Sequence, residues 1–80
     1  MTEVTLLYFA SLRDAAGISS ERVETSATDL SALYAEVSAR HGIDWTTDAL
    51  RVAVNGEFAR WSDPLPAGGE VAFIPPVSGG

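Results

Sequence analysis

TDLSALYAEVSARHG, residues 28–42, is the stretch that decides the fold of this chain. Four apolar residues recur at positions i, i+3, i+4 and i+7, which is the spacing of one apolar face of an α-helix: Leu30, Leu33, Tyr34 and Val37. Thr28 can cap such a helix, and Asp29 suits its positive N-terminal end. Gly42 can take the left-handed conformation that ends it. The stretch therefore predicts one amphipathic helix between Thr28 and Gly42.

Strand patterns lie on both sides of this helix. The first run of β-branched and aromatic residues is apolar on both alternating faces, which is typical of a central strand, whereas the second has polar neighbours and reads as an edge strand. A short helical turn ending at Gly17 separates the two. After the helix, Asn55-Gly56 supplies the two-residue turn of a hairpin, and Pro75-Pro76 stops the last strand. The predicted strands are residues 4–10, 22–25, 50–54, 57–59 and 70–74.

This order of elements predicts an α+β fold of the β-grasp (ubiquitin-like) type, a five-stranded mixed sheet with one main helix packed on one face. Residues 1–74 form the single domain, and residues 75–80 form an extended C-terminal tail. The predicted core is Val4, Leu6, Tyr8, Leu30, Leu33, Val37, Val52, Val54, Val71 and Phe73. Strand alternation leaves a second apolar set on the opposite face, where either a loop covers it or it docks a partner: Leu7, Phe9, Phe58 and Ile74.

The composition is that of one small acidic domain. The chain has 80 residues, no cysteine and a single histidine, so disulfides are excluded and a structural zinc site is nearly excluded. A net charge of -6 argues against nucleic acid as a partner, because phosphates require clustered cations. No apolar window reaches the roughly 18 residues of a membrane span, and no basic stretch precedes the first apolar run. We therefore expect a cytoplasmic protein.

Motifs for intrinsic catalysis are missing from the sequence. It contains no glycine-rich phosphate loop, no cysteine nucleophile and no pair of metal ligands at helical spacing. His41, near the predicted helix end, is expected to be a solvated cap rather than a base. The sequence predicts no enzymatic activity of its own, no bound metal and no bound cofactor.

The last seven residues, Ile74-Pro75-Pro76-Val77-Ser78-Gly79-Gly80, carry the remaining signal. Most chain ends are simply frayed. Here the two prolines are expected to make the base of the tail stiff and extended. Gly79 and Gly80 lack a Cβ, so they can pass through a narrow channel and bring a terminal carboxylate to a nucleotide or nucleophile. The predicted reactive group is the α-carboxylate of Gly80.

The stretch GGEVAFIPPVSGG, residues 68–80, together with Asn55-Gly56, resembles the MoaD family of ubiquitin-like sulfur carriers, the small subunits of molybdopterin synthase. Residues 9–14, FASLRD, are similar to the same family's N-terminal segment, so the resemblance covers the chain end to end. One departure is Gly69, where the family usually carries Asp. This change alters a turn and leaves the tail intact.

The resemblance implies a role in molybdenum cofactor biosynthesis. A ubiquitin-activating-like adenylyltransferase, using ATP with Mg, adenylates the Gly80 carboxylate, and sulfur then replaces AMP to give a thiocarboxylate. The loaded tail inserts into the large subunit of molybdopterin synthase, with which a heterotetramer is expected. There the sulfur is transferred to cyclic pyranopterin monophosphate to build the dithiolene of molybdopterin.

The family pattern also implies roles for particular residues. Gly79 and Gly80 are the functional terminus, and the stem inserted into the partner is Pro75, Pro76, Val77 and Ser78. A docking surface for both partners is formed by Phe9, Phe58 and Ile74, with Arg13 as a polar contact beside it. Three alternatives remain: a thiamin-type sulfur carrier, a ubiquitin-related protein modifier with the same tail chemistry, and a plain interaction domain.

Overall fold

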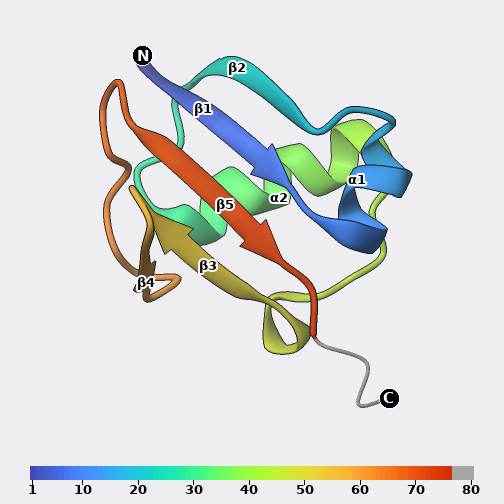
Figure 1. The fold of residues 1–80 in the computed structure, drawn as a ribbon. Helices are drawn as coiled ribbons and strands as arrows, with labels where there is room; N and C mark the ends of the chain where they lie inside the picture. The colour runs from blue at the N-terminus through green and yellow to red at the C-terminus, as the bar shows by residue number, and fades with distance from the viewer. Residues whose placement is uncertain (77–80) are drawn as a thin grey trace.

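A five-stranded mixed sheet with a helix across one face forms the framework of the molecule in a computed structural model, which describes residues 1–76 (Figure 1). The strand order is β2-β1-β5-β3-β4, with β1 and β5 parallel and the other pairs antiparallel. This arrangement confirms the predicted β-grasp fold. The elements are β1 (Thr2–Tyr8), α1 (Ala10–Ala16), β2 (Ser20–Thr25), α2 (Leu30–His41), the 3-10 helix η1 (Thr47–Ala49), β3 (Arg51–Val54), β4 (Glu57–Ala59) and β5 (Glu70–Ile74).

The strands occupy the positions that their sequences predict. β1 pairs on both sides, with β2 and β5, whereas β2 lies at the edge of the sheet. β1 ends at Tyr8, two residues earlier than predicted, because the chain turns into α1 through Ala10, whose φ is +49°. The β3–β4 hairpin turns at Asn55 and Gly56, whose φ values of +50° and +87° are those of a type I′ turn. The Asn-Gly pair therefore has the role that the sequence predicts.

Helix α2 differs from its prediction only at its first residue. Asp29, and not Thr28, is the N-cap, because the Asp29 Oδ1 atom accepts the backbone N–H of Ala32 at 2.8 Å. At the other end Gly42 adopts φ +65° and donates its N–H to the Ser38 carbonyl, as expected. Within residues 1–76, no helix has both the length and the apolar character needed to cross a membrane.

The core lies between α2 and the sheet. Of the predicted core residues only Val54 is partly exposed, and the others are buried. Phe73 of β5 lies at the centre, stacked on Trp61 at 6.0 Å between ring centroids and in edge contact with Tyr34 at 5.1 Å. The predicted core omitted Tyr34, although the helical spacing places it on the apolar face, and it also omitted four buried residues of short elements and loops: Leu12, Val23, Ile43 and Leu50.

The start of β5 explains the unusual glycine at position 69. Asn55 donates its backbone N–H to the Glu70 carbonyl, and its side-chain Oδ1 accepts the Glu70 N–H, both at 2.9 Å. A Cβ added to Gly69 would lie 2.6 Å from that same Oδ1 atom. The close approach of the Asn55 amide therefore favours glycine where the resembling family usually has aspartate.

Candidate docking groove and tail root

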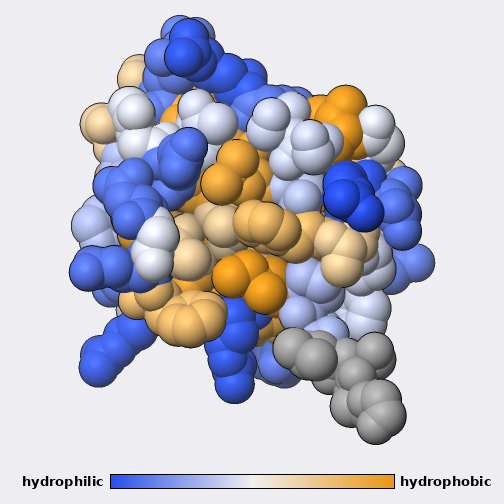
Figure 2. All heavy atoms as spheres, in the orientation of Figure 1, coloured by the Kyte–Doolittle hydropathy of each residue, from blue (hydrophilic) through white to orange (hydrophobic). Residues whose placement is uncertain are grey.

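The sheet face opposite α2 carries an open apolar groove of about 240 Å³. In Figure 2 hydrophobic atoms gather over the middle of this face, with hydrophilic atoms around them. Within residues 1–76, Glu70 is the one carboxylate that lines the groove, and the apolar lining residues are Leu7, Phe9, Ala53, Phe58, Ala72 and Ile74. We call this surface the docking groove.

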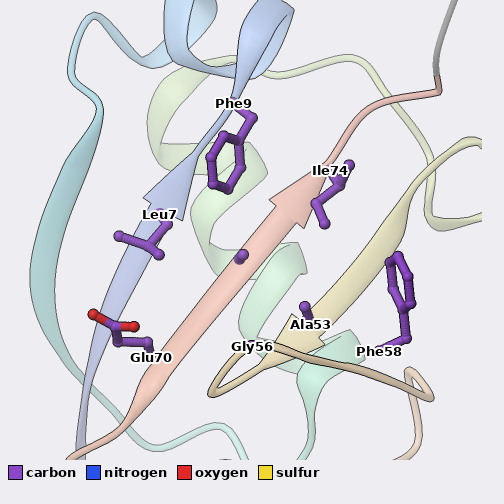
Figure 3. Close-up of a pocket in the computed structure, with 8 residues that line it drawn as sticks. Leu7, Phe9, Ala53, Gly56, Phe58, Glu70 and Ile74 are labelled. Atoms are coloured by element: carbon purple, nitrogen blue, oxygen red, sulfur yellow. The ribbon is translucent and has the colours of Figure 1, made fainter.

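Strand alternation builds the groove. Val71 and Phe73 are fully buried, so Ala72 between them and Ile74 after them point to the opposite face. Ala72 pairs in register with Ala53 of β3, and these two small side chains leave the middle of the groove shallow. The larger side chains rise around this floor (Figure 3).

The exposure of the aromatic side chains decides whether a loop covers this apolar face or leaves it open to a partner. Phe58 is 76% exposed and Phe9 is 47% exposed, so no loop within residues 1–76 covers the groove. The predicted placement of Leu7, Phe9, Phe58 and Ile74 on this face is confirmed. Their role in docking stays a prediction.

The root of the tail lies at one end of the docking groove. Ile74 is both the last residue of β5 and a lining residue, and Figure 3 shows it at the same end as Phe9. Pro75 is half-buried and Pro76 is exposed. The predicted site residues Val77, Ser78, Gly79 and Gly80 lie outside the described residues. The chain therefore leaves the sheet directly beside the apolar surface.

Arg13, the predicted polar contact, is exposed on α1, the helix that follows β1. It forms no ion pair within residues 1–76, and its backbone carbonyl accepts the N–H of Gly17. The structure thus leaves its side chain available, without bringing it into the groove lining.

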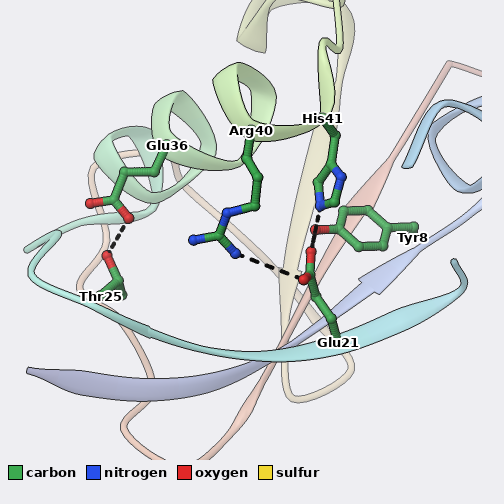
Figure 4. A network of polar contacts seen from close by, with 6 residues as sticks. All are labelled: Tyr8, Glu21, Thr25, Glu36, Arg40 and His41. Carbon is green, nitrogen blue, oxygen red and sulfur yellow. Dashed lines mark hydrogen bonds and ion pairs between the residues drawn. The ribbon is translucent and has the colours of Figure 1, made fainter. Parts of the chain in front are cut away.

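A polar cluster on the helix side of the sheet contradicts the expectation for His41 (Figure 4). Its side chain is only 16% exposed, and its Nε2 atom lies 2.6 Å from Glu21 Oε2. Because an ionised carboxylate only accepts hydrogen bonds, Nε2–H is the donor. The Tyr8 hydroxyl donates to the same oxygen at 2.5 Å, and the Arg40 guanidinium lies 3.8 Å from the other oxygen. His41 is a packed partner of Glu21 and not a solvated cap.

The cluster holds Glu21 in its ionised form. Burial acts to raise the pKa of Glu21, but the hydrogen bonds from Tyr8 and His41 and the charges of His41 and Arg40 outweigh it and lower the pKa. Burial, and then the bond to Glu21, raises the pKa of Tyr8, so its hydroxyl stays a donor. These contacts join β1, the edge strand β2 and the end of α2, which is a structural role.

Residues 1–76 offer a surface for contact with a partner. This part of the chain contains no group of three or more His, Cys, Asp or Glu side chains that could hold a metal ion. The docking groove offers apolar area and one carboxylate. Sequence reasoning missed its floor, Ala53 and Ala72, because small residues give no signal until the strands are paired in register.

Solved structures with the same fold include a small archaeal modifier protein and subunits of molybdopterin-converting factor. The chain is similar to SAMP1 from Haloferax volcanii, with a TM-score of 0.80, 28% identity and coverage of 98% of this chain and 99% of that one. It is equally similar to a putative molybdopterin converting factor, subunit 1, from Pyrococcus furiosus, with a TM-score of 0.80, 29% identity and coverage of 96% and 100%. It also shares its fold with a chain in the complex of subunits 1 and 2 of molybdopterin-converting factor from Helicobacter pylori, with a TM-score of 0.68, 23% identity and coverage of 98% and 99%.

Curated relatives are similar over nearly their whole length. The molybdopterin synthase sulfur carrier subunit of Chlamydomonas reinhardtii is 35% identical, with coverage of 98% of this chain and 99% of the relative. The protein of the same name from Escherichia coli (strain K12) is 32% identical, with coverage of 96% and 99%. The family model described as the ThiS family matches residues 6–80. These matches confirm the resemblance read from the tail and the hairpin, and the chain belongs to the ThiS family.

Proposed function

We propose that this chain is the sulfur-carrier small subunit of a molybdopterin synthase. The names of relatives that align over nearly the full chain support this assignment. The observation that carries it is structural: the docking groove ends at Ile74, the residue from which the tail leaves the sheet. A partner that covers the groove is therefore placed to receive the tail.

The proposed chemistry takes place at the Gly80 carboxylate. A carboxylate oxygen attacks the α-phosphorus of ATP and pyrophosphate leaves, which turns a poor electrophile into an acyl adenylate. The terminal sulfur of a donor persulfide then attacks the acyl carbon and AMP leaves. A thiol then attacks the donor-side sulfur of the resulting acyl disulfide, which forms a new disulfide with the donor and releases the thiocarboxylate. ATP, Mg and the catalytic side chains belong to the activating adenylyltransferase, and the carrier itself supplies no catalytic group.

Both partners are proposed to use the docking groove in turn. An exposed apolar surface with aromatic walls has the composition of an interface core. A single groove serves one partner at a time, so the activating enzyme must release the loaded carrier before the large subunit binds it. The large subunit then directs the thiocarboxylate to cyclic pyranopterin monophosphate, and two carriers bound to a large-subunit dimer give the expected heterotetramer.

A one-residue extension tests the tail chemistry. An alanine added after Gly80 removes the glycine carboxylate from its required position and is expected to abolish sulfur loading by the activating enzyme. The matched control carries the same alanine before Met1, and we expect it to load normally. Mass spectrometry of both proteins after incubation with activating enzyme, ATP and a sulfur donor gives the result. Normal loading of the extended tail would contradict the proposal.

Protein modification is a second candidate function, because SAMP1, the small archaeal modifier protein 1 of Haloferax volcanii, has a TM-score of 0.80 to this chain at 28% identity. A modifier joins its terminal carboxylate to lysines of other proteins. An N-terminally tagged chain expressed in its own cells would then produce a ladder of conjugates that disappears when Gly80 is deleted. A carrier with no modifier function produces no ladder.

A further inference from the structure

Arg51 lies beside the tail root, at the end of the docking groove. It is the first residue of β3 and pairs in antiparallel register with Ile74, the last residue of β5. Opposed residues in an antiparallel pair point to the same face of the sheet, so Arg51 and Ile74 share the groove face. Figure 1 shows the start of β3 beside the end of β5. Arg51 is exposed just beyond the lining residues.

The charge of Arg51 is not neutralised within the described part of the chain. Arg22 pairs with Glu3 at 4.0 Å and Arg40 with Glu21 at 3.8 Å, but Arg51 has no ion pair in residues 1–76. Glu70, the carboxylate of the groove, stands at the other end of β5. The groove thus runs from a carboxylate to a cation at the tail root, in a protein whose net charge is -6.

Burial of Ile74 by a partner has a consequence for Arg51. The Cβ atoms of opposed residues in an antiparallel pair lie only about 4.5–5.5 Å apart. A protein surface that covers Ile74 therefore also approaches the side chain of Arg51 and can exclude water from its guanidinium. Removing water from an unpaired charge is costly, so a partner that binds well must place an anionic group against it.

The nucleotide of the activation step does not fit as that anionic group. Held extended in a channel, the segment from Pro75 to Gly80 spans about 20 Å, at roughly 3.3 Å per residue. An acyl adenylate at Gly80 is then much farther from the tail root than an arginine side chain reaches. The complementary group must belong to the protein surface around the opening that receives the tail.

We infer that Arg51 is a specificity contact for the large subunit, forming an ion pair with an Asp or Glu carboxylate at the opening that receives the tail. The ion pair anchors one end of the groove while apolar contacts fill its middle. It favours large subunits with an acidic opening over those with a basic one. This inference rests on the proposed function.

Charge reversal tests the inference. The binding of Arg51→Glu to the purified large subunit is measured by isothermal titration calorimetry at low and high salt, beside wild type. Arg22→Glu is the matched control, because it makes the same charge change on the edge strand β2, three strands away from β3. Thermal unfolding of both variants checks the fold.

We expect Arg51→Glu to weaken binding at low salt by about tenfold or more, and Arg22→Glu to change it by less than about twofold. The difference between wild type and Arg51→Glu should shrink at high salt, because ions screen the pair. Equal affinities of the two folded variants would overturn the role of Arg51 and leave the proposed function standing. Failure of the wild-type chain to bind the large subunit would overturn both.

Discussion

Replacing Phe58 with alanine separates docking from folding more sharply than any other change in the groove. Phe58 is 76% exposed on the three-residue strand β4, so its ring contributes little to the core. We expect the free energy of unfolding to change by less than about 0.5 kcal/mol, as for other exposed positions. Any larger effect of the substitution should therefore appear in binding to a partner.

The size of that binding effect follows from the exposed ring. An aromatic side chain buries roughly 150–250 Å² in an interface. Three quarters of such an area is about 150 Å², which at about 25 cal/mol per Å² sets an upper bound near 4 kcal/mol. Interface anchors lose about 2 kcal/mol or more on truncation, so the affinity for the large subunit should fall at least about 30-fold.

Calorimetric titration of Phe58→Ala against the large subunit measures this loss, and urea unfolding measures the stability. Trp45→Ala is the control, because Trp45 is also an exposed aromatic residue but does not line the groove. Its contact with Tyr34 uses the backbone carbonyl, which the substitution keeps. Wild-type affinity for Phe58→Ala, or an equal loss for both variants, would refute the docking role of the groove.

Other substitutions test the framework that positions the groove. Glu21→Ala leaves the buried Tyr8 hydroxyl without its acceptor, so urea unfolding should show a loss of about 2–3 kcal/mol. Because folding lowers the pKa of Glu21 from its ordinary 4.5, its carboxylate stabilises the fold above that pH. This part of the stability is lost as the pH falls through the pKa that Glu21 has in the folded protein. Glu21→Ala should not show this loss. Equal acid sensitivity of wild type and Glu21→Ala would contradict the assignment of this stabilisation to the Glu21 carboxylate. Gly69→Ala should lower the free energy of unfolding by about 1–2 kcal/mol, as measured by thermal unfolding. The loss should be smaller in a protein that also carries Asn55→Gly, because the clashing amide is then absent. An equal loss with and without Asn55→Gly would count against the contact. Asp29→Ala should cost about 1 kcal/mol of stability in urea unfolding, and an unchanged midpoint would show that its cap is dispensable.

Local patterns predicted much of this fold. The helical spacing after Asp29, the Asn55-Gly56 turn and the first strand, apolar on both faces near its end, each depend on neighbours within a few residues. These features predict the order of elements along the chain and the apolar face that becomes the groove. Thr28 and Asp29 can both cap a helix, and only the geometry of the first turn decides which of them is the N-cap.

Contacts between distant residues could not be predicted in this way. Glu21 and His41 are 20 residues apart, and nothing in the pattern around either one points to the other. Arg51 becomes a neighbour of Ile74 only when β3 and β5 are paired in register. The shallow floor of the groove likewise requires two alanines to meet across strands. These features depend on tertiary pairing, which a single sequence does not encode locally.

The most direct test of the sulfur-carrier function is the intact mass of the protein isolated from its own cells, with fragmentation to locate any change. Localisation is essential, because replacing oxygen by sulfur changes the mass almost as oxidation of Met1 does. We predict a fraction of chains with a thiocarboxylate at Gly80. A carboxylate that stays unmodified after incubation with activating enzyme, ATP and a sulfur donor would contradict the proposed function.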